Sequence, residues 1–165
     1  MIWLNIKKLE VLLANSQLTE KRAFYYLLLN LIFIAIAMRT PPSLEFTSEL
    51  WKLSDFFLDL GVTIAGTYLV FSINSKGDNR DFLKRYFSLG FVHALRLALL
   101  FVFLGLVYKI IMFVIPGEWW FEICEFNNGD PAQILKTLGF SFIYYWLLTG
   151  SFKRVNAHKA KTLQA

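Results

Sequence analysis

The chain has few of the residues on which metal and redox chemistry depend. It contains one cysteine and two histidines among 165 residues. An internal disulfide is therefore impossible, and a metal site needing several cysteines from one chain is excluded. With two histidines we do not expect a histidine-based metal site unless chains share ligands. The sequence also lacks a P-loop and the G-x-S-x-G, H-E-x-x-H and G-x-G-x-x-G motifs. We therefore expect no bound metal and no cofactor, and the common soluble enzyme classes are not indicated.

Basic residues are absent from one connector and concentrated elsewhere. Residues 116–131 contain four acidic residues and no Lys or Arg. By contrast, four basic residues precede the first apolar stretch, four lie between the second and third, and four follow the last: Lys7, Lys8, Lys21, Arg22; Lys76, Arg80, Lys84, Arg85; Lys153, Arg154, Lys159, Lys161. Under the positive-inside rule this pattern predicts a multi-pass protein of the plasma membrane with both termini cytoplasmic.

Apolar residues are abundant and gathered into four stretches. The chain is 56% hydrophobic, against roughly 45–50% in soluble domains. We predict an all-α integral membrane protein, a single domain over residues 1–165, with four spans at 23–38, 56–73, 86–115 and 134–152 in an antiparallel bundle. Ser54 is the expected N-cap of the second span. Apolar residues at helical spacing within 2–15 predict a short amphipathic helix at the membrane interface.

Ionisable residues inside the predicted spans are the candidate functional groups, because a charge in the bilayer usually has a partner or a water cavity. Lys136 is set aside because it lies at the outer boundary of the fourth span and can snorkel, which leaves Asp59, His93, Arg96 and Lys109. Asp59 and Lys109 lie at similar predicted depths, so we weigh an ion pair between them against independent snorkelling. Arg96 has no acidic residue to neutralise it in the first or fourth span, which favours a lipid phosphate, an aqueous cavity or a partner protein. Asn30 is a candidate for an interhelical hydrogen bond.

Small residues predict where helices approach closely. They form a stripe on the third span and a shorter one on the second: Gly90, Ala94, Ala98 and Gly105; Gly61 and Ala65. If Gly61 and Ala65 face the third span, Asp59 points away from Lys109. The sequence leaves that choice open.

Three function classes remain in competition. The first is a non-enzymatic membrane protein acting through protein contacts, as an accessory, assembly, immunity or defence component. In its number of spans and cytoplasmic ends alone, the layout resembles immunity proteins against pore-forming colicins. The alternatives are a small oligomeric channel or transporter subunit and a membrane-embedded enzyme. Expected partners are membrane lipids and a membrane protein or a second copy; nucleic acid is not expected, because the basic residues flank apolar stretches and form no basic helix face.

Overall fold

The computed structural model describes residues 5–37, 46–114 and 129–162. These residues form the helices α1 (Ile6–Ala14), α2 (Glu20–Ala37), α3 (Glu49–Lys76), α4 (Phe82–Val114) and α6 (Asp130–Thr162), and the described ranges contain no strand. The prediction of an all-helical protein is confirmed.

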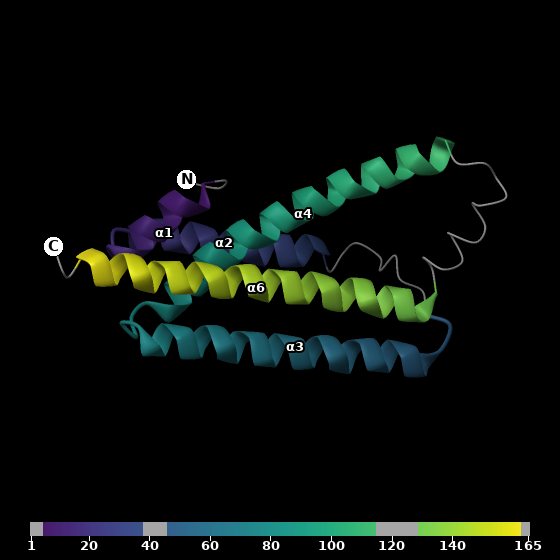
Figure 1. Ribbon diagram of the computed structural model, residues 1–165, viewed down its shortest axis with the longest axis horizontal. Coiled ribbons are helices and arrows are strands. Elements are labelled where there is room, and N and C mark those ends of the chain that lie inside the picture. Colours follow the sequence, from purple (N-terminus) through teal and green to yellow (C-terminus); the bar gives the residue numbers. More distant parts are fainter. Residues whose placement is uncertain (1–4, 38–45, 115–128, 163–165) are drawn as a thin grey trace.

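The helices are not packed in chain order. α6 packs on both α3 and α4, α2 packs on α4, and α1 covers parts of α6 and α4. The consecutive α3 and α4 share fewer contacts, among them the Phe71 and Phe82 rings at 5.2 Å and the Thr67 and Tyr86 hydroxyl groups at 3.3 Å. α1, the α3–α4 turn and the C-terminal part of α6 all lie at one end of the molecule (Figure 1). We call this the polar end.

Two helix boundaries differ most from the sequence-based prediction, the start of α3 and the end of α6. Ser48, rather than Ser54, is the N-cap of α3, and its hydroxyl accepts a hydrogen bond from the Trp51 amide. Ser54 lies one turn inside the helix and donates to the Leu50 carbonyl at 2.8 Å. α6 begins at Asp130, as the Asp-Pro pair suggests, but runs ten residues past the predicted end at 152. Its extra turns carry the basic residues of the C-terminal cluster to the polar end.

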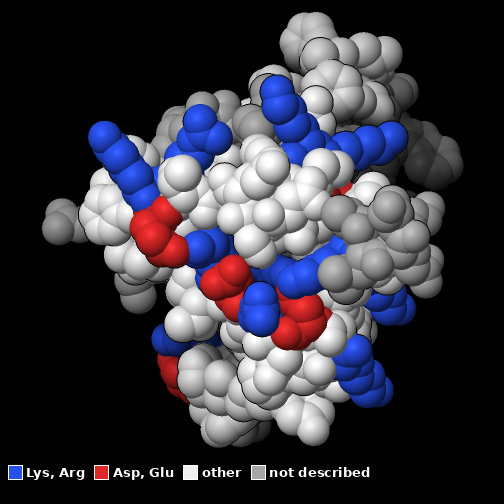
Figure 2. Space-filling model, turned by 90° about the vertical axis from the view of Figure 1, so that its left-hand side faces the viewer, with Lys and Arg blue, Asp and Glu red and all other residues white. Residues whose placement is uncertain are grey.

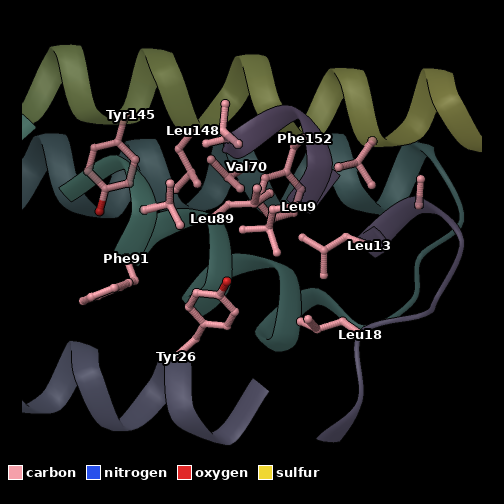
Figure 3. Packing of buried hydrophobic residues seen from close by; sticks show 14 residues of the cluster. Leu9, Leu13, Leu18, Tyr26, Val70, Leu89, Phe91, Tyr145, Leu148 and Phe152 are labelled. Atoms are coloured by element: carbon pink, nitrogen blue, oxygen red, sulfur yellow. The ribbon is translucent and has the colours of Figure 1, made fainter. Parts of the chain in front are cut away.

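The buried core gathers near the polar end. It joins Val70 of α3, Leu89 of α4 and Leu148 and Phe152 of α6, all of which are fully buried (Figure 3). The helix predicted within 2–15 is present as α1, but its apolar face does not lie open to lipid. Leu9 and Leu13 are 0% and 3% exposed because they pack into this core. α1 is therefore an integral part of the bundle.

Only two helices of the described ranges are long and apolar enough to cross a membrane. They are α3 and Phe82–Ile111 of α4, and only 11% and 6% of their most apolar windows are buried, unlike the core helix of a soluble protein. α2 carries Glu20, Lys21 and Arg22 within its 18 residues, and α6 is diluted by serine, threonine and tyrosine. The two apolar helices indicate membrane association, and the spans at 23–38 and 134–152 stay predictions.

Candidate functional site

A buried arginine organises the α3–α4 turn. Arg85, on the second turn of α4, is 0% exposed. Its two terminal nitrogens each donate to the Asp78 carboxylate at 2.6 Å, and Nη1 also donates to Asn74 Oδ1 at 2.9 Å. The turn between these residues uses left-handed backbone at Asn79 and Asp81, a conformation that Asn and Asp tolerate better than most residues. Asp78 thus holds the guanidinium of Arg85 at this turn.

Asp78 also receives a cation from α6. Lys159 Nζ donates to Asp78 Oδ2 at 2.5 Å. Burial alone would raise the pKa of Asp78, but hydrogen bonds from Arg85 and Lys159, with the guanidinium charge, hold that pKa well below its usual range. Asn156 of α6 donates to the Ile73 carbonyl at 2.8 Å. The C-terminal end of α3 is thus tied to the last turns of α6.

A second network attaches α1. Glu10 is 1% exposed, and its carboxylate accepts three hydrogen bonds from Arg154 of α6 at 2.8–3.1 Å. Arg154 Nη2 also donates to the Ser151 hydroxyl at 2.9 Å, and Ser151 Oγ lies 2.9 Å from His93 Nε2 of α4. Fixed contacts therefore run from α1 through α6 to α4. On the exposed side, Lys84 of α4 pairs with Glu20 of α2.

A cavity of about 550 Å³ opens beside the first network. Ile73, Gly77 and Asp78 line it from α3 and the turn, and Lys153, Asn156, Lys159 and Ala160 line it from α6, together with Lys76. Viewed from the polar end, Lys and Arg side chains surround the few Asp and Glu side chains (Figure 2). Within the described ranges, no group of three or more His, Cys, Asp or Glu side chains gathers as a metal site would require.

The structure does not bring Asp59 and Lys109 together. Asp59 accepts a hydrogen bond from Ser141 of α6 at 2.5 Å, and no ion pair of the described residues includes Lys109. Of the two alternatives weighed from the sequence, the ion pair is not formed in this structure, because α3 packs on α6 rather than on the outer part of α4. Arg96 is exposed on α4 and has an interaction partner within the folded chain, so it is not an orphan cation.

Two other candidates from the sequence lie at helix contacts. Asn30 makes the interhelical hydrogen bond that its position predicts, because its side-chain nitrogen donates to the Phe87 carbonyl of α4 at 2.8 Å. His93 is 3% exposed and belongs to the network that reaches α1. Both side chains therefore join neighbouring helices in this fold.

Only some residues of the predicted small-residue stripes lie at helix–helix contacts. Gly90 is buried against Tyr144 of α6, and Ala94 and Ala98 are half-buried. Gly105 has no neighbouring atom within 4 Å of where a Cβ would stand. On α3 the contact glycine is Gly66, where a Cβ would come within 2.3 Å of the Tyr145 ring. The predicted contact residues on that helix, Gly61 and Ala65, are exposed and line an open groove between α3 and α6. The face of α3 that carries Asp59 and Gly66 therefore packs, and its partner is α6.

The sequence reasoning missed Glu10 and Asp78 as organising residues. A signal for Glu10 was present: it lies four residues after Ile6 and three before Leu13, on the apolar side of its own helix. A charged residue on an apolar face predicts a buried partner. For Asp78 no local signal distinguishes an ion-pair role from capping. Neither the family models nor the curated proteins nor the solved structures contain a match to this chain.

Proposed function

We propose that this is a four-span protein of the plasma membrane that acts through contact with another membrane-embedded helix. α2, α3, α4 and α6 would be the spans, and the polar end would lie in the cytoplasm. The position of all three basic clusters at that end supports this orientation under the positive-inside rule (Figure 1). In this role the chain is an accessory, assembly, immunity or defence component.

The observation that carries the proposal is the outer part of α4. In this part, which ends at residue 114, α4 diverges from the other helices (Figure 1). From residue 102 to residue 114 its large apolar side chains, Val107 and Met112 aside, are 38% to 91% exposed. The last ring contact of α4 with α6 that precedes this segment joins Phe101 and Phe140 at 5.4 Å. We call residues 102–114 the outer segment of α4.

The outer segment has the features of a helix-docking face in a bilayer. Gly105 leaves space for the close approach of another backbone. Lys109 carries a charge without an ion-pair partner among the described residues, and a charge at membrane depth costs about 2.5–3.5 kcal/mol on insertion scales. A partner helix that supplies a carboxylate or a polar side chain near Lys109 would lower this cost. The partner is another membrane protein or a second copy of this chain.

Site-specific photo-crosslinking in native membranes tests the proposal. A photoreactive residue replacing Leu106 in the outer segment should give a defined adduct, and Gly105→Leu should remove it without loss of the folded protein. Leu58 on α3 is the matched control, since the two leucines are 57% and 48% exposed. Equal adducts from both positions, or none from position 106, would refute the docking role. An adduct of twice 19.2 kDa would identify a second copy as the partner.

The orientation has its own test. Reporter fusions after Ala165 and between Asn127 and Gly129 should report opposite compartments, with the C-terminal fusion cytoplasmic. The same compartment at both sites would refute the proposed orientation, independently of the crosslinking result.

A further inference from the structure

The cavity at the polar end combines positive charge with an apolar wall. Its lining includes the three lysines Lys76, Lys153 and Lys159 and a single carboxylate, that of Asp78. That carboxylate is already bound by Arg85 through two hydrogen bonds. The lining therefore has an excess of positive charge and disfavours a cation.

The three lysines are held differently. Lys159 is fixed on the cavity wall by its hydrogen bond to Asp78, with a side chain 22% exposed. Lys76 and Lys153 are exposed, approach from α3 and α6, and make no ion pair with any carboxylate of the described residues. One ammonium group is thus pre-positioned, and two more are available to an anion that enters.

The rest of the lining matches an amphiphile. Ile73 and Ala160 give the cavity an apolar wall, and its volume of about 550 Å³ falls within the range of about 300–1,000 Å³ typical of small-ligand sites. Gly77 lets the turn approach α6 closely, since a Cβ there would lie 2.4 Å from the Asn156 side chain. The cavity therefore depends on the packing of the turn against α6, and it lies where the ends of α3 and α6 would meet lipid headgroups.

We propose that this cavity binds a phosphate group, carried by the headgroup of an anionic phospholipid or free in solution. Lys159 would contact the phosphate oxygens from the wall while Lys76 and Lys153 close over it, and the glycerol of a lipid would lie against Ile73 and Ala160. The site is separate from the outer segment of α4, so the docking proposal and this one can fail independently. Only the lipid source depends on membrane insertion.

Native mass spectrometry of the full-length protein in a neutral detergent tests the site with three ligands. Dioctanoyl phosphatidylglycerol carries chains and phosphate, dioctanoylglycerol carries the same chains alone, and sodium phosphate carries the anion alone. We expect a single saturable adduct with the phosphatidylglycerol and much weaker retention of the diglyceride. Competition by millimolar sodium phosphate would assign free phosphate as a ligand, and its absence would assign the lipid headgroup.

A pair of double variants with equal charge loss locates the binding. Lys76→Gln with Lys153→Gln removes two charges from the cavity, whereas Lys7→Gln with Lys8→Gln removes two from exposed α1 positions at the same end. The first should weaken phosphatidylglycerol binding by about tenfold or more, because each lysine near an anionic lipid contributes about a fivefold factor. The second should change it by less than about twofold. Equal losses would show diffuse attraction only, and equal binding of the diglyceride would show that phosphate is not recognised. Either result overturns the proposal. The proposal would also fail if a glutamate-rich peptide bound and none of the phosphate-containing ligands did.

Discussion

The ion pair between Glu10 and Arg154 predicts an asymmetry between two single substitutions. The Glu10 side chain is 1% exposed and that of Arg154 is 52% exposed. Arg154→Gln leaves a buried carboxylate without its cation, and breaking a buried pair in this way costs about 3–5 kcal/mol. Glu10→Gln leaves a guanidinium that can turn into water, so we expect a cost of about 1–2 kcal/mol from the lost charge-assisted bonds. The double variant should cost less than the sum, because the second change removes the charge that the first one strands.

Unfolding of the full-length protein in micelles measures these free energies, and hydrogen exchange at α1 shows where the loss occurs. Protection of the α1 amides should fall most in Arg154→Gln, because this contact holds α1 on α6. Glu20→Gln is the matched control. Glu20 is 87% exposed in its pair with Lys84, and exposed pairs contribute about 0–1 kcal/mol. A larger loss for Glu10→Gln than for Arg154→Gln, or strictly additive effects, would refute the reasoning.

Three further predictions concern packing, acid and coupling. Gly66→Ala should destabilise the fold by about 1–3 kcal/mol, since its Cβ would stand 2.3 Å from a tyrosine ring of α6. Gly61→Ala has open space around it and should be neutral or stabilise α3 by about 0.5–1 kcal/mol. Thermal unfolding measures both variants, and equal destabilisation would contradict the packing of α3 on α6. The lowered pKa of Asp78 means that its ion pairs stabilise the fold fully above the unfolded pKa of about 3.9 and lose that effect as the pH falls toward the folded pKa. Asp78→Asn should therefore flatten the loss of stability between pH 5 and pH 3 in unfolding titrations, and an unchanged slope would show that another group governs it. The losses of folding free energy caused by Asp59→Ala and by Lys109→Ala should add within about 0.5 kcal/mol in a double-mutant cycle. A coupling energy above about 1 kcal/mol would mean that the two side chains form an ion pair, contrary to the structure.

The sequence predicted where the helices lie better than it predicted which helices pack against one another. Apolar runs and the Asp-Pro pair at 130 place α2, α3, α4 and α6, because helix formation depends on local spacing and on end signals. The N-cap of α3 was placed six residues late, since Ser48 and Ser54 are chemically equivalent caps and only the folded helix shows which one is used. Periodicity does not encode the order in which four antiparallel helices pack. The pairing of α3 with α6 therefore needed the structure.

In the candidate site, too, local features could be predicted from the sequence and long-range contacts could not. Asn30 was found because a polar side chain inside an apolar run requires a bond, and its partner is the nearest helix in space. Depth alone suggested the Asp59 pair, but two residues at one height are in contact only if their helices are neighbours and their faces meet. The basic clusters were read from the sequence as an orientation signal, and the carboxylates of Glu10 and Asp78 were given no role. Long-range ion pairs across 144 and 81 positions leave no trace in a local pattern.

The ion pairs at the polar end give its basic residues a different role once the chain has folded. Under the proposed orientation, Arg85, Arg154, Lys159 and Lys84 would act as cations that resist translocation while the helices are still separate. In the folded chain Lys84, Arg154 and Lys159 are each bound to a carboxylate from a distant part of the sequence, and Arg85 is bound to Asp78, seven positions before it. The residues that would first set the direction of insertion afterwards hold the assembled helices together. If the proposed orientation holds, reversing the sign of each pair would keep opposite charges together in the folded chain but would remove the basic residues that set the direction of insertion.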